Sequence, residues 1–138
     1  MAAEVEITVV SHPRWLRVIR SVLAEYAESK GLDSQSAHEV VLAVDEAAAN
    51  VIKHSYQGDP GGRVTVAASE IAGGIEVEII DNGEPFNPIR HPVPAPDEIR
   101  AGGRGVFLMQ AAMDSVEYEQ RDGRNCVRMK KLLKAHAE

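Results

Sequence analysis

Glu46 and Asn50 are the first pair of residues in this chain whose types and spacing suggest chemistry. They stand four residues apart in a stretch with helical periodicity, so both project from the same side of that helix. The opposite side carries an apolar stripe of Ala37, Val41, Val44 and Ala48. Magnesium takes hard oxygen ligands and keeps several waters, so an Asn carbonyl together with phosphate oxygens is a suitable ligand set. The alternative is an ordinary solvated helix face, where isolated Glu and Asn residues usually lie.

Asp81 is the second candidate, because it follows an apolar, strand-like stretch that ends at Ile80. The next two residues, Asn82 and Gly83, form a turn sequence that would let the backbone approach a flat ligand closely. The alternative is a turn made for chain topology alone.

The third candidate is the run from Gly102 to Gly105, which leads into a predicted helix. Glycines in such a position free the backbone amides to surround an anion, and the helix N-terminus adds partial positive charge. A glycine-rich turn before a helix is also common for structural reasons alone. Neither the P-loop lysine pattern nor a dinucleotide fingerprint is present in the sequence.

The elements that must position these residues follow from the periodicity of apolar side chains. Period-two alternation predicts strands, helical spacing predicts helices, and Pro13, Gly31 and either Asp33 or Ser34 supply helix boundaries. The predicted strands are 4–10, 63–69, 75–80, 115–120 and 125–133, and the predicted helices are 13–30, from 33 or 34 to about 54, and 106–113. This order predicts an α+β fold, a two-layer α/β sandwich whose mixed, mostly antiparallel sheet carries helices on one face. Trp15 is expected in the core, with a role in an interface as the alternative.

The length and composition limit the kinds of protein that this chain could be. With 138 residues, we expect one domain over 1–138, and the proline-rich stretch 84–101 reads as a long irregular loop of the kind that covers a site. A net charge of −6 argues against direct nucleic-acid binding. The single cysteine, Cys126, excludes an internal disulfide, and we find no leader or membrane span. We therefore expect a cytoplasmic protein.

Taken together, the three candidate segments resemble the ordered motifs of the histidine-kinase/Hsp90-type (GHKL) ATP-binding superfamily. Residues 44–56 (VDEAAANVIKHSY) resemble its first motif, residues 79–88 (IIDNGEPFNP) its second, and residues 101–114 (AGGRGVFLMQAAMD) its third. The short chain and the residues of the first two motifs are most similar to those of the anti-sigma-factor serine kinase branch. The resemblance implies the Bergerat-type ATP-binding fold, with 84–101 as a mobile ATP lid.

The resemblance also implies roles for single residues. Asn50 would hold Mg²⁺, and Glu46 would act as general base on the acceptor hydroxyl or orient the attacking group. Asp81 would accept a hydrogen bond from the adenine amino group, while Gly83 would let adenine approach. The phosphates would be bound by a set consisting of Lys53, Gly103, Arg104, Gly105 and Val106, in which Arg104 would also stabilise charge during transfer. His54 is expected to be structural.

The function implied is an ATP-dependent protein-serine/threonine kinase that is also an anti-sigma factor. Such a protein would phosphorylate a STAS-type anti-sigma-factor antagonist, sequester a sigma factor and form a homodimer. A second hypothesis is a regulatory binding module that uses ATP only to set its conformation. A third is an α+β domain in which the motifs are coincidental.

Overall fold

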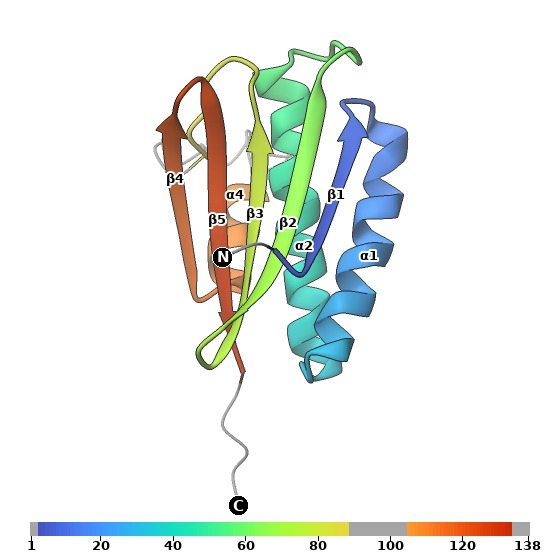
Figure 1. Ribbon diagram of the computed structural model, residues 1–138, viewed down its shortest axis with the longest axis vertical. Coiled ribbons are helices and arrows are strands. Elements are labelled where there is room, and N and C mark those ends of the chain that lie inside the picture. The colour runs from blue at the N-terminus through green and yellow to red at the C-terminus, as the bar shows by residue number, and fades with distance from the viewer. Residues whose placement is uncertain (1–2, 89–104, 134–138) are drawn as a thin grey trace, which may run out of the picture.

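The structure is a computed structural model that describes residues 3–88 and 105–133, without the side chains of 105–108. Its single five-stranded sheet has the order β1-β2-β3-β5-β4, and the helices pack on one face of it (Figure 1). The strands are β1 (Val5–Val10), β2 (Arg63–Ile71), β3 (Gly74–Asp81), β4 (Ser115–Arg121) and β5 (Arg124–Leu132). The helices are α1 (Leu16–Ser29), α2 (Ser34–Asn50) and α4 (Gly105–Ala112), with a 3₁₀ turn at Pro13–Trp15 and a π-helical turn at Val51–Ser55.

The predicted α+β sandwich is confirmed, with one correction to its sheet. A mixed sheet was expected, yet every strand pairing among the described residues is antiparallel. The reason is the path after β3. The chain passes through α4 and forms a hairpin of β4 and β5, and β5 pairs directly with β3 while β4 takes the edge.

The helix boundaries follow from local sequence. Asp33 caps α2 because its side-chain oxygen accepts a hydrogen bond from the backbone N–H of Ser36 at 2.7 Å. Gly31 follows α1 with a φ of 87°, a left-handed conformation that glycine adopts without steric cost. Both boundaries lie where the sequence predicts them.

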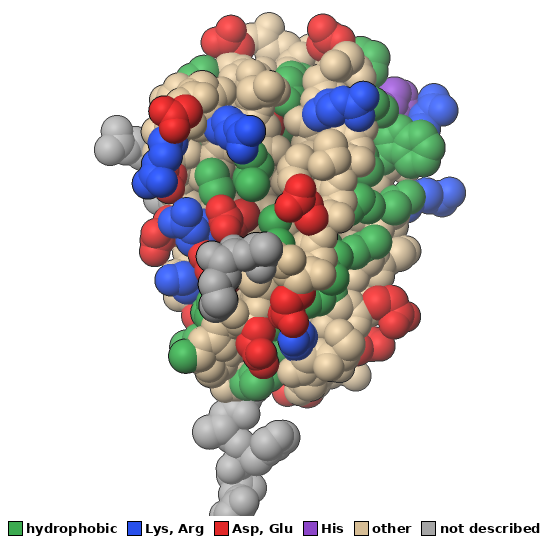
Figure 2. Space-filling view, viewed as in Figure 1, with side chains coloured by type: hydrophobic (Ala, Val, Ile, Leu, Met, Phe, Trp, Pro, Cys, Tyr) green, Lys and Arg blue, Asp and Glu red, His purple; other side chains and the backbone are tan. Residues whose placement is uncertain are grey.

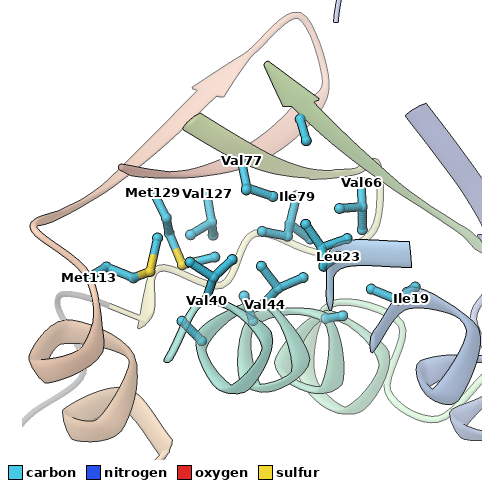
Figure 3. Close-up of a cluster of buried hydrophobic side chains, with 14 of the residues drawn as sticks. Ile19, Leu23, Val40, Val44, Val66, Val77, Ile79, Met113, Val127 and Met129 are labelled. Carbon is cyan, nitrogen blue, oxygen red and sulfur yellow. The ribbon is translucent and has the colours of Figure 1, made fainter. Parts of the chain in front are cut away.

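The core lies between the sheet and the helices. Alternate residues of the strands point inward, and Figure 3 shows them meeting side chains from α1 and α2. The buried set includes Ile19, Leu23, Val40, Val44, Val66, Val77, Ile79, Val127 and Met129. This layer fixes the ends of α2 and β3 relative to each other, and the candidate residues lie at those ends.

The other face of the sheet carries interspersed acidic and basic side chains (Figure 2). Arg128 on β5 is central to it and contacts a carboxyl oxygen of Glu76 at 2.9 Å and one of Glu119 at 3.3 Å. Within residues 3–88 and 105–133, no helix is long and apolar enough to cross a membrane.

Trp15 does not lie in the core, so that prediction is wrong. Its side chain belongs to the 3₁₀ turn before α1 and is 38% exposed. The turn lies directly before Leu16, the first residue of α1. Its neighbours Arg14 and Arg17 are exposed as well.

Candidate functional site

The first part of the site is the end of α2, where the helix changes its winding. After Asn50 the chain forms a π-helical turn, in which the N–H of Tyr56 donates to the C=O of Val51 at 3.0 Å. Single π turns of this kind are rare in proteins overall, but those that occur are often at functional sites. The wider turn changes the direction of the side chains that follow it.

Asn50 and Glu46 are both partly buried, so neither lies on a fully solvated helix face. The Nδ2 atom of Asn50 is buried and has no hydrogen-bond partner within the described part of the chain. Glu46 is half-buried, and burial raises the pKa of its carboxyl, with the negative charge of Asp45 as a smaller cause. A buried amide without a partner is uncommon in folded proteins and calls for a ligand or water. The pair therefore fits a polar ligand better than it fits an ordinary helix surface.

Asp81 ends β3 as predicted, and it is only 5% exposed. Its Oδ1 accepts hydrogen bonds from Asn125 Nδ2 and from the backbone N–H of Gly83, both at 2.9 Å. Burial raises the pKa of this carboxyl, while hydrogen bonds from Asn125, Gly83 and Ser55 lower it. The side chain is therefore a buried acceptor with a fixed orientation.

Asn125 is a site residue that the sequence does not reveal. It lies on β5 directly opposite Asp81 in the strand register and is 3% exposed. Besides its bond to Asp81, its Nδ2 donates to the C=O of Gly83 at 3.0 Å, and its Oδ1 accepts from the Tyr118 hydroxyl at 3.2 Å. Only the pairing of β3 with β5 could have indicated it, since nothing in the local sequence distinguishes this asparagine.

Gly83 is required by the chain's own packing. A Cβ at this position would lie 2.5 Å from the carbonyl oxygen of Ser55. The same carbonyl accepts a hydrogen bond from the N–H of Glu84 at 2.8 Å. The turn after Asp81 is thus bound to the π-helical turn, and the two predicted motifs lie side by side.

Two further contacts made by aromatic residues lie beside these two turns. The ring of His54 stacks on Phe86, with centroids 4.1 Å apart and an interplanar angle of 15°. The hydroxyl of Tyr56 lies 2.8 Å from Oδ1 of Asn82. The stacking agrees with the structural role expected for His54.

The phosphate-binding candidates are only partly within the described residues. Gly103 and Arg104 lie outside them, as does most of the predicted lid. Gly105 begins α4, with Val106 in its first turn, so the helix start agrees with the prediction. Lys53 is exposed. Among the residues described, no group of three or more His, Cys, Asp or Glu side chains could hold a metal ion.

Comparison with known proteins identifies the family to which this site belongs. The family described as "Histidine kinase-like ATPase domain" matches residues 9–131. The chain belongs to this family.

Within the histidine kinase-like ATPase family, similar proteins are named serine-protein kinases. Serine-protein kinase RsbW of Oceanobacillus iheyensis is 29% identical over 127 residues, which cover 86% of this chain and 80% of that protein. RsbW of Bacillus subtilis is 27% identical over 127 residues, with 86% and 79% covered. The family expected from the motifs is thus confirmed.

Solved structures support the fold. The RsbU and RsbW domains of Rv1364c from Mycobacterium tuberculosis match with a TM-score of 0.71 and 21% identity, covering 96% of this chain and 33% of that one. The SiaB–SiaC complex from Pseudomonas aeruginosa matches with a TM-score of 0.62 and 13% identity, covering 95% and 91%. At these identities the likeness concerns the histidine kinase-like ATPase fold alone.

Proposed function

We propose that this chain is a single-domain, ATP-dependent protein-serine/threonine kinase and anti-sigma factor. It would phosphorylate a STAS-type anti-sigma-factor antagonist and sequester a sigma factor, as a cytoplasmic homodimer. The observation that carries the proposal is the buried Nδ2 of Asn50, which has no hydrogen-bond partner among residues 3–88 and 105–133, one turn after the half-buried carboxyl of Glu46. The similarity to proteins named serine-protein kinase supports phosphate transfer to a hydroxyl.

The residues present fit a magnesium nucleotide. Asn50 offers a partly buried amide, whose Oδ1 suits Mg²⁺ and whose buried Nδ2 suits a phosphate or water oxygen. When bound, Mg²⁺ would neutralise negative charge on the phosphates. Lys53, Arg104 and the backbone amides of Gly103, Gly105 and Val106 are the remaining phosphate candidates.

Asp81 is proposed to bind the adenine amino group. Its buried carboxyl keeps acceptor capacity beyond the bonds from Asn125, Gly83 and Ser55, since a carboxylate has about four lone-pair sites. Gly83 holds the adjoining turn close to Ser55 and so keeps that carboxyl in place.

Glu46 is proposed to accept the proton of the acceptor hydroxyl. Burial raises the pKa of its carboxyl, which makes it a stronger base than an exposed glutamate. Phosphate transfer depends mainly on positioning and charge stabilisation, so a carboxyl carried by a packed helix suits the reaction.

An exposed cluster at the start of α1 is our candidate for contact with a partner protein. Trp15 lies there among three exposed arginines, Arg14, Arg17 and Arg20, in a chain whose net charge is −6. Tryptophan and arginine are enriched among residues that carry binding energy. The chemistry fits an acidic protein surface with an apolar side chain at its centre.

The test is transfer of labelled phosphate from ATP with Mg²⁺ to a purified STAS-type antagonist. We expect incorporation into a serine or threonine of the acceptor, and its loss in Asn50→Ala and Glu46→Gln, of which the second should still bind ATP. Transfer retained in Glu46→Gln would remove the role of that residue. ATP binding without incorporation would favour the nucleotide-gated binding module, and no ATP binding would refute the proposal.

A further inference from the structure

The amide of Asn125 has a forced orientation. Its Nδ2 lies 2.9 Å from a carboxyl oxygen of Asp81 and 3.0 Å from the carbonyl oxygen of Gly83. Both partners are acceptors at these atoms, so only the NH₂ end of the side chain satisfies them. The other end, Oδ1, then faces the Tyr118 hydroxyl, which donates to it at 3.2 Å.

This arrangement uses both N–H donors of Asn125 inside the protein. The N–H of Gly83 is used as well, since it donates to Asp81 at 2.9 Å. The side chain of Ser55 is hydrogen-bonded to the same carboxyl. These donors are all paired with acceptors inside the protein, and the carboxyl, with about four lone-pair sites, keeps acceptor capacity. A buried site with this polarity accepts an N–H and opposes a carbonyl oxygen, because unpaired or repelling buried acceptors cost free energy.

We propose that Asn125 determines base specificity, by holding Asp81 as an acceptor so that the site takes a purine with an amino group at position 6 and rejects one with a keto group there. The inference rests on the proposed function, in which Asp81 binds the base. Asn125 is a positioning residue in this scheme, since it acts on the base through Asp81.

The charge state of Asp81 follows from the same contacts. Burial raises the pKa of the carboxyl, and among the hydrogen bonds that lower it the one from Asn125 is the largest. Replacing this amide with a carboxyl would remove the donor and add a second acid in contact with the first. Two carboxyl groups in such proximity share a proton, because both do not ionise readily. The shared proton would give the site a donor that a keto base could use.

The experiment compares ATP with inosine triphosphate, whose base carries a keto group where adenine has its amino group. Affinities of the full chain are measured by calorimetry with Mg²⁺. We expect the wild type to prefer ATP by roughly 10- to 100-fold, the range for one hydrogen bond to a charged group. Asn125→Asp should lower this preference by about 10-fold or more, with a gain in affinity for inosine triphosphate.

Gln120→Glu is the matched control. It makes the same change from amide to carboxyl at an exposed position of the neighbouring strand, opposite Asn125 in the register. The ratio of the two affinities should stay at the wild-type value in this variant. A loss of stability alone would weaken the binding of both nucleotides and leave the ratio of their affinities unchanged.

The outcomes separate the inference from the proposed function. If the wild type binds neither nucleotide, the proposed function fails. If the wild type prefers ATP and folded Asn125→Asp keeps that preference, the inference is overturned while ATP binding stands. Should Asn125→Asp not fold, Asn125→Ala decides, since freeing Asp81 should also reduce the ratio, and an unchanged ratio there overturns the inference.

Discussion

Replacing Gly83 with alanine should destabilise the fold and weaken nucleotide binding together. The added Cβ would lie 2.5 Å from the carbonyl oxygen and 2.8 Å from the carbonyl carbon of Ser55, distances that real Cβ atoms essentially never show. The obstructing atoms are backbone atoms at the end of the π-helical turn, and the same carbonyl accepts the hydrogen bond from Glu84. The clash is therefore relieved only by moving one turn away from the other.

The magnitude follows from these contacts. Forcing extra volume into a packed region costs about 1–3 kcal/mol. Weakening the bond between Glu84 and Ser55 adds about 1 kcal/mol. The lower chain entropy of unfolded alanine offsets about 0.4–1 kcal/mol. The net loss of about 1–3.6 kcal/mol corresponds to a melting temperature about 3–12 °C lower for a domain of this size.

Thermal unfolding by circular dichroism measures this loss, and Gly61→Ala is the control. A Cβ at Gly61 would meet only the side chain of Asp59, at 3.1 Å, and both residues are exposed. Equal melting temperatures for Gly83→Ala and Gly61→Ala would refute the reasoning. ATP affinity should fall in the first variant and stay at the wild-type value in the second.

Three further predictions test other parts of the structure. Asp81→Asn should abolish ATP binding yet stabilise the fold at neutral pH. The pKa of the Asp81 carboxyl is raised above 3.8 in the folded protein, so the free energy of unfolding of the wild type falls as pH rises through the interval between the unfolded and folded pKa values. Urea unfolding at pH 3 and pH 7 checks this, and an equal difference between variant and wild type at both pH values would contradict it. Cys126, whose thiol pKa is raised to about 12 chiefly by burial, should react with iodoacetamide at pH 8 far more slowly than glutathione does, and equal rates would show that the thiol is not protected. Glu39→Ala should lower the free energy of unfolding by about 3–5 kcal/mol, because it leaves the buried ammonium of Lys131 without its carboxylate partner at 2.8 Å. Glu28→Ala, at an exposed position, is the control, and equal urea midpoints for the two variants would exclude the effect.

The local features of this fold could be predicted from the sequence. Period-two and helical patterns locate the strands and helices, and Gly31 and Asp33 mark helix ends, because these signals depend on neighbouring residues alone. The spacing of Glu46 and Asn50 likewise indicates a shared side of one helix.

What the sequence does not reveal depends on distant contacts. Asn125 joins Asp81 only because β5 pairs with β3, and the burial of the Asn50 Nδ2 atom depends on what packs against the end of α2. The exposure of Trp15 has the same origin, since a large apolar residue is buried only where another element covers it. The winding of Val51–Ser55 is a further example, because its residues have no composition typical of a π turn.

The π-helical turn also fixes the rotation of the chain between Asn50, at the end of α2, and the Ser55 carbonyl, which contacts the turn after Asp81. A π turn contains about one residue more than an α-helical turn, and each residue of a helix rotates the chain by about 100°. Deleting one residue between Asn50 and Ser55 would leave the core of α2 intact but turn the Ser55 carbonyl away from Gly83 and Glu84. The length of this five-residue segment should therefore stay constant, so that insertions and deletions among relatives are expected elsewhere in the chain.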